Sequence, residues 1–431
     1  RLVALLESHG IEWRRTATVD VQHTPSALNT DQKVALFRRL FQGRTDLYPV
    51  RWESKAGKTG YAPACANEWR AGICEKPRIK CSDCGHRSLI ALTDRTIFDH
   101  VAGRHTTGVY PLLTDDTCNF LAVDFDDAEW REDAKGFAKS CRELGVPVAL
   151  EVSRSGEGAH AWVFFSTSVA ARDARRLGTA LISFTCARTR QLKLTSYDRL
   201  FPSQDTLPSR KGGAPSGPHV GGFGNLIALP LQKKPRDQGR SVFVDDALQA
   251  FPDQWAYLAS IEPMAPRDIE PTILRATGGS HPLDVTFVAD EDSLEPWKPR
   301  SSATQRLAGP MPEAVAVTLA NLVYAAKAQL PQPLANRLVR LAAFQNPEFY
   351  RAQAMRMPVW DKPRVIGCAE NFPQHIGLPR GCLDAVQQLF RDQGIRCDLR
   401  DERSTGEPLV VTFVGTLRPD QQAAAKAMLK N

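Results

Sequence analysis

One stretch constrains the fold of this chain more than any other: the apolar run Phe120-Leu-Ala-Val, which ends in Asp124-Phe-Asp126. Four consecutive apolar residues predict a buried strand, and the spacing of the two aspartates puts both side chains on the same face of it. Two carboxylates held side by side repel each other unless a cation lies between them, and oxygen ligands suit Mg²⁺ or Mn²⁺. The pair predicts either a divalent-metal site or a solvated strand end that leads into the next helix.

A glycine-rich turn follows one predicted helix later, in the run from Ser153 to His160. It lies between two strand-like stretches, 146–152 and 161–165. Glycines let the backbone approach a phosphate closely, and the hydroxyl and guanidinium groups between them can bind it. The residues we assign to the phosphates are Ser153, Arg154, Ser155, Gly156 and Gly158. We assign His160 a hydrogen bond to the incoming triphosphate rather than to a metal. A plain hairpin and a core histidine explain each feature alone, but their position after the acid pair favours a nucleotide site.

A third polar element follows a second predicted helix. It supplies two further acids, Asp198 and Asp205, and two amides, Gln204 and Asn225, that could bind nucleotide or template. Asp198 and Asp205 are rival candidates for the third metal ligand, and spacing does not decide between them.

Four of the ten cysteines fall within twenty residues. A cytosolic metal site explains such clustering better than disulfides do. The predicted ligands of a tetrahedral zinc ion are Cys65, Cys74, Cys81 and Cys84. Four thiolates leave no open position, so the site is predicted to be structural or nucleic-acid-binding rather than catalytic. His86 could replace one of the cysteines.

A chain of 431 residues exceeds what one hydrophobic core usually organises, so we expect several domains. Strands (118–125, 146–152, 161–165, 225–231) alternate with helices (132–144, 170–187), which predicts an α/β fold. We divide the chain into an N-terminal helical lead-in (1–44), a zinc-binding module (45–95), a catalytic core (96–262), a proline-rich linker (263–312) and a separate C-terminal α/β domain (313–431). In the last domain 314–344 and 383–393 are predicted helical and 408–414 a strand. A helix capped at 29–31 and stopped by Gly43 is expected in the lead-in.

The composition fits a globular protein, with 42% hydrophobic and 24% charged residues and no apolar run long enough to span a membrane. The formal net charge of +7 favours polyanionic partners without proving one. No secretion signal follows Arg1. We expect an intracellular, cytoplasmic fragment.

The Asp-x-Asp pair, the serine–glycine turn ending in His160 and a later acid before Asn225-Leu-Ile-Ala-Leu-Pro230 resemble the archaeo-eukaryotic primase superfamily, the primase-polymerases. The wider sequence is similar to the primase region of TOTE conflict-system proteins, in Gly60-Tyr-Ala-Pro-Ala-Cys65 and Phe201-Pro-Ser-Gln-Asp205. The resemblance implies a core with an RRM-like half, a divalent-metal cleft and template-directed addition of NTP or dNTP on single-stranded or primed DNA, in replication or a defence system. The stretch 207–218 is longer than the family's usual turn.

The similarity continues through 341–349, 378–382 and 415–421, segments that in such proteins precede a superfamily 2 helicase. The sequence contains no P-loop, so the chain is expected to stop just before that motor. Two other readings compete with the enzyme. One is a non-catalytic nucleic-acid-binding module that targets a helicase. The other is a metal-dependent nuclease, which would leave the triphosphate turn unexplained.

Overall fold

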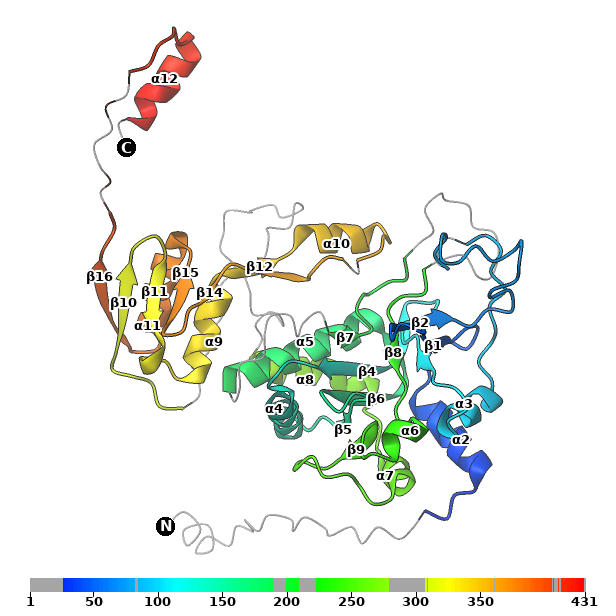
Figure 1. The fold of residues 1–431 in the computed structure, drawn as a ribbon. Helices are drawn as coiled ribbons and strands as arrows, with labels where there is room; N and C mark the ends of the chain where they lie inside the picture. Colours follow the sequence, from blue (N-terminus) through cyan, green and yellow to red (C-terminus); the bar gives the residue numbers. More distant parts are fainter. Residues whose placement is uncertain are drawn as a thin grey trace, which may run out of the picture.

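The centre of the computed structural model is a five-stranded antiparallel sheet (Figure 1). Its strands, in spatial order, are β7 (Leu200–Phe201), β4 (Thr117–Phe125), β6 (Ala159–Ala170), β5 (Ala149–Val152) and β9 (Val242–Val244). The structure describes residues 26–81, 84–188, 199–208, 222–278, 307, 309–359, 361–404, 406, 410 and 412–429. The strand predicted around Phe120 is therefore a central one with neighbours on both sides.

Both faces of this sheet are buried, which explains why the middle of β4, residues 120–123, is apolar at every position rather than alternating. On one face Leu121, Val123 and Phe125 belong to a core shared with three helices. These helices are α4 (Trp130–Glu143), α5 (Ala171–Arg188) and α8 (Ile269–Thr277). They confirm the helices predicted near 132–144 and 170–187.

The opposite face carries Phe120, Ala122 and Trp162 and packs against α2 (Thr30–Leu40) and α7 (Gln254–Ser260). Phe41 packs against this face, and its ring lies edge-on to Trp162 at 5.0 Å between centroids. Asn29 caps α2 by accepting a hydrogen bond from the Gln32 backbone amide, and Gln32 returns the bond in a capping box. The predicted start of this helix is thus confirmed.

Short elements border this second face. The hairpin β1 (Pro49–Glu53) and β2 (Thr59–Pro63) precedes the cysteine-rich segment, and α3 (Asp94–Val101) follows it. Strand β3 (Gly108–Val109) pairs with β8 (Ile227–Ala228), and α6 (Lys233–Arg236) comes next. Only these two residues of the predicted strand 225–231 are paired as a strand.

The C-terminal region has its own hydrophobic core and a five-stranded sheet. In spatial order the strands are β14 (Glu370–Asn371), β15 (His375–Leu378), β11 (Val323–Ala326), β10 (Ala314–Leu319) and β16 (Arg396–Asp401). Its helices are α9 (Gln332–Leu341) and α11 (Leu383–Asp392), and the latter confirms the helix predicted there. A hairpin of β12 (Ala343–Gln345) and β13 (Val365–Gly367) flanks α10 (Pro347–Ala354), and α12 (Pro419–Met428) carries no buried residue.

Three predictions outside the core were wrong. The stretch 314–344 begins with β10 and β11, because the buried Val315, Val317 and Leu319 alternate with more exposed Ala and Thr residues and so follow the strand period. In 408–414 the described residues form no strand, and the edge strand is instead the charged β16, which pairs in parallel with β10. The predicted linker begins later than 263, because α8 packs on α5 and contributes Ile269 and Ile273 to the central core.

Within the described residues, no helix is long and apolar enough to cross a membrane.

Candidate active site

Three ionisable side chains form a row across the central sheet. Asp124 on β4 lies directly opposite His160 on β6, and His160 lies directly opposite Glu151 on β5. Directly paired residues in antiparallel strands point to the same face. The row therefore lies on the face that carries Trp162, at the end of β4 where Asp126 follows.

Asp124 and Asp126 are joined by a cationic side chain that sequence analysis did not identify. Arg199 forms an ion pair with Asp126, and its guanidinium lies 3.9 Å from the Asp124 carboxylate. Burial and the Asp126 carboxylate raise the pKa of Asp124, while His160 and Arg199 oppose the shift. Asp124 is thus partly buried and Asp126 exposed, and the Arg199 guanidinium lies beside both carboxylates.

Glu151 holds His160 from the side opposite Asp124. His160 Nδ1 lies 2.9 Å from Glu151 Oε2, and the Trp162 indole donates to the same oxygen at 3.0 Å. The other imidazole nitrogen, Nε2, is 3.6 Å from Asp124 Oδ1. Although burial alone lowers the pKa of His160, the Glu151 carboxylate, followed by Asp124 and Asp126, raises it above its ordinary value. The ring is therefore disposed to carry positive charge among these acids.

The serine–glycine turn packs directly against the acid pair. A side chain at Gly158 would lie 2.7 Å from the Phe125 carbonyl oxygen and 3.4 Å from the Asp126 Cα, so only glycine fits. Gly156 has a φ of +78°, which favours glycine as well. The hydroxyls of Ser153 and Ser155 lie 3.1 Å apart. The sequence separates this turn from Asp126 by a helix and a strand, and the fold brings them into contact.

Basic groups surround this turn. Arg240 donates a hydrogen bond to the Ser155 carbonyl at 3.0 Å. Arg154 has a buried Nε with no hydrogen-bond partner among the described residues. The charges of both Arg154 and Glu151 act on Tyr61 of strand β2, whose pKa is raised chiefly by burial. The β1–β2 hairpin thus reaches the same site.

The residues of the third element have different surroundings. Asp205 forms an ion pair with the buried Arg175 and accepts a hydrogen bond from the Gln353 side chain of α10 at 2.7 Å. Gln204 donates to the Thr206 carbonyl at 2.5 Å within its own loop, and Asn225 accepts from the Ser203 amide at 3.1 Å and so joins its segment to that loop. Asp198 lies outside the described residues.

The four clustered cysteines share one small cavity. Cys65, Cys74, Cys81 and Cys84 line a space of about 20 Å³ together with His86. Burial raises the pKa of Cys81, and nearby Lys76 opposes that shift. The Ser88 amide donates a hydrogen bond to Cys65 Sγ at 3.3 Å. These thiols are of the type that binds zinc, and they face a common space.

Nowhere in the described part of the chain do three or more His, Cys, Asp or Glu side chains stand close enough together to hold a metal ion. The donor types fit the predicted metals: carboxylate oxygens for Mg²⁺ or Mn²⁺ and thiolates for zinc. Both metal sites stay predictions.

Glu151 and Arg199 are the main residues that sequence analysis missed. A signal for Glu151 was present, since it is the one charged residue in the apolar run from Val146 to Val152. It is only 1% exposed. Arg199 offered no such signal, because its role depends on the pairing of β7 with β4.

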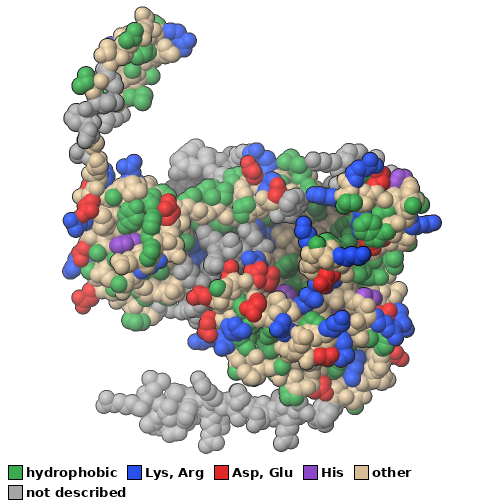
Figure 2. Space-filling model, viewed as in Figure 1, with side chains coloured by type: hydrophobic (Ala, Val, Ile, Leu, Met, Phe, Trp, Pro, Cys, Tyr) green, Lys and Arg blue, Asp and Glu red, His purple; other side chains and the backbone are tan. Residues whose placement is uncertain are grey.

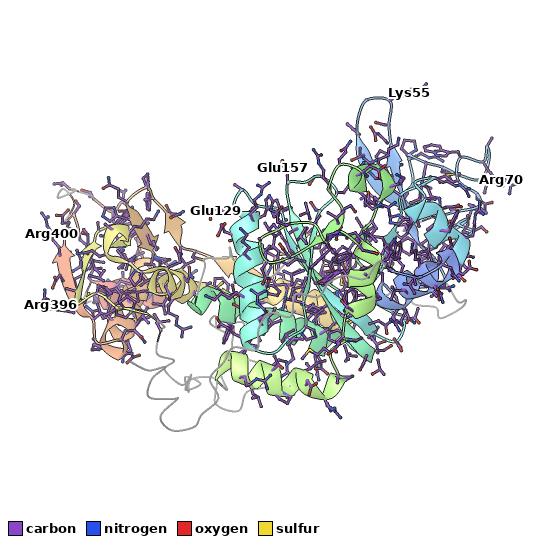
Figure 3. The ribbon with its side chains drawn as sticks, turned by 90° about the horizontal axis from the view of Figure 1, so that it is seen from below. Lys55, Arg70, Glu129, Glu157, Arg396 and Arg400 are labelled. Carbon is purple, nitrogen blue, oxygen red and sulfur yellow. The ribbon has the colours of Figure 1, made fainter. Side chains whose placement is uncertain are left out.

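On the visible face of the molecule, acidic side chains gather near the middle beside a hollow that Lys and Arg side chains border (Figure 2). Glu129 and Glu157, which follow β4 and β5 respectively, lie along one edge of the core (Figure 3). Together, the mixed α/β core and the row of acids and histidine define a primase-like fold. The chain belongs to the archaeo-eukaryotic primase domain family of the TOTE conflict system, whose model matches residues 32–272.

Among solved structures, the polymerase domain of Mycobacterium tuberculosis Ligase D in complex with DNA is similar at 11% sequence identity. The match covers 58% of this chain and 89% of that one, with a TM-score of 0.28. A comparison with curated proteins finds no match.

Proposed function

We propose that this chain is a template-directed nucleotidyltransferase, a primase-polymerase that adds NTP or dNTP on a single-stranded or primed DNA template. The observation that carries the proposal is the contact between the glycine turn and the acid pair. Gly158 packs against the backbone of Phe125 and Asp126, while His160 lies beside Asp124. A carboxylate pair next to a turn suited to phosphates is what phosphoryl transfer requires. Membership of the primase family supports the same reading.

The side chains have separate roles in this proposal. Asp124 and Asp126 would hold Mg²⁺ or Mn²⁺, which would supply a lower pKa for the attacking hydroxyl and neutralisation of phosphate charge. A positively charged His160 donates a hydrogen bond from Nε2 to the triphosphate. Hydroxyl and amide groups of the turn bind the phosphates from the other side, together with Arg154.

We propose Asp198 rather than Asp205 as the third metal ligand. Asp198 is joined by one peptide bond to Arg199, whose carbonyl accepts a hydrogen bond from the Asp124 amide at 3.1 Å. Asp205, in contrast, already compensates the charge of Arg175, which is only 2% exposed. Moving Asp205 to a metal would leave that guanidinium buried without its counter-ion.

We also propose that the four clustered cysteines hold a structural zinc ion. Their thiols must be reduced to bind it, which fits the proposed cytoplasmic location. A helicase domain of the same full-length protein is the proposed partner.

The test is incorporation of labelled nucleotides on unprimed and primed single-stranded DNA with Mn²⁺ or Mg²⁺. Asp124→Ala with Asp126→Ala should lower incorporation at least about a hundredfold, because the metal site is lost. The matched control is Asp384→Ala with Asp392→Ala, which removes two exposed aspartates from α11. That control should keep full activity.

Equal incorporation by the wild type and the active-site double variant would refute the proposal. If neither protein incorporates label but both bind DNA alike, the chain is a non-catalytic binding module. Degradation of the DNA that depends on Asp124 and Asp126 would instead identify a nuclease. Extension of a supplied primer alone would limit the activity to that of a polymerase.

A further inference from the structure

The buried carboxylate of Glu151 has no place in the proposed transfer reaction, yet it contacts the residue next to the acid pair. Its side chain lies in the middle of the sheet, between β6 and β9, and is only 1% exposed. Burial of an acid in a strand is costly unless its oxygens are hydrogen-bonded. The hydrogen-bond partners of Glu151 must therefore stabilise its buried carboxylate.

Those partners fix which group donates each hydrogen bond. The Trp162 indole N–H can only donate, so Glu151 Oε2 is an acceptor. Since a carboxylate has no hydrogen to donate, His160 Nδ1, 2.9 Å from the same oxygen, supplies the hydrogen that it shares with Oε2. The Ser241 hydroxyl, at 3.4 Å, donates to the other oxygen, Oε1. Two side chains of β6 and the residue just before β9 thus hold the carboxylate in one orientation.

We propose that Glu151 is a positioning residue for His160: it fixes the proton on Nδ1 and directs Nε2 toward the Asp124 side of the site. The expected effect of Glu151 on nucleotide binding rests on the proposed function, since Nε2 is the atom assigned to the triphosphate. A buried carboxylate behind a functional histidine is a general device that sets both the tautomer and the angle of the ring. Trp162 contributes by holding the carboxylate itself.

Two substitutions separate hydrogen bonding from charge. Glu151→Gln keeps an oxygen that can accept from both Trp162 and His160, and its amide can donate to Ser241. Glu151→Met has a similar length but no acceptor. We expect Glu151→Met to raise the KM for nucleotide about 10- to 100-fold with a smaller effect on kcat. Glu151→Gln should bring KM back toward the wild-type value, since it keeps the acceptor for Nδ1 and loses only the negative charge.

The matched control is Glu143→Gln, which removes the same charge from an exposed position at the end of α4, away from the turn. Its KM for nucleotide should stay unchanged. An equal rise in KM for Glu143→Gln, or a Glu151→Gln variant as impaired as Glu151→Met, would overturn the proposal in favour of a general charge effect.

A second measurement is independent of activity and of variant folding. In the wild-type chain labelled with ¹⁵N-histidine, NMR at a pH where the ring is neutral shows which nitrogen carries the hydrogen, and His160→Gln identifies the signal. We expect the hydrogen on Nδ1. A hydrogen on Nε2 would overturn the proposal whether or not the chain adds nucleotides. If the chain is inactive while the hydrogen is on Nδ1, the proposed function fails but the positioning role stands.

Discussion

His100 is predicted to make the stability of the core depend strongly on pH. This residue of α3 is fully buried, and both ring nitrogens have backbone partners. The Thr107 amide donates to Nδ1 at 3.1 Å, and Nε2 donates to the Pro230 carbonyl at 2.9 Å. Only the neutral ring can make both bonds, since a hydrogen on Nδ1 would face the Thr107 N–H. Burial accordingly lowers the pKa of His100 from 6.5 to about 4.

The sign and size of the effect follow from that shift. The folded state binds a proton at His100 less readily than the unfolded state, so this contribution to stability is fully present above pH 6.5. It is lost as the pH falls from 6.5 to about 4. At 1.36 kcal/mol for each pH unit, the loss amounts to about 3 kcal/mol.

The control variant is His100→Gln, whose amide can accept from Thr107 and donate to Pro230 but does not titrate. The free energy of unfolding is measured by urea denaturation at pH 7, 5.5 and 4. Tryptophan fluorescence is a suitable signal, because Trp255 packs within 6.3 Å of the Phe37 ring that also contacts His100. Between pH 7 and 4 the wild type should lose about 3 kcal/mol more than the variant. Parallel pH profiles for the two proteins would refute the reasoning.

Three further predictions concern the site and the cysteine cluster. Asp198→Asn should abolish nucleotide addition. Asp205→Asn should keep that activity but lower the free energy of unfolding by about 3 kcal/mol, because Arg175 loses its buried partner. The reverse pattern in incorporation and urea assays would assign the metal to Asp205. Gly158→Ala should lower the free energy of unfolding by about 1–3 kcal/mol, since its Cβ would lie 2.7 Å from the Phe125 carbonyl, and an unchanged urea midpoint would contradict this. Zinc measured by elemental analysis should be present in the wild type and lost in Cys81→Ser; wild-type protein without zinc would exclude the predicted ion.

Local sequence was sufficient for the elements whose signals lie within a few residues. The apolar run before Asp124 predicted β4, the capping residue Asn29 predicted the start of α2, and the glycines of the turn predicted a sharp reversal before His160. Strand periodicity also placed Asp124 and Asp126 on one face. Where periodicity was misread, as in 314–319, the alternation that defines β10 was present in the sequence.

Only the tertiary structure decided which side chains meet. The register of β6 between β4 and β5 brings Glu151 and Asp124 to the two sides of His160, although nothing in the spacing of the three residues along the chain fixes that register. The pairing of β7 with β4 brings Arg199 to the acid pair, and α10 draws Asp205 toward Arg175. Such contacts depend on strand order and helix packing, which are set by the burial of whole faces rather than by neighbouring residues. The sequence by itself therefore determined the chemical groups of the site, and the fold determined their partners.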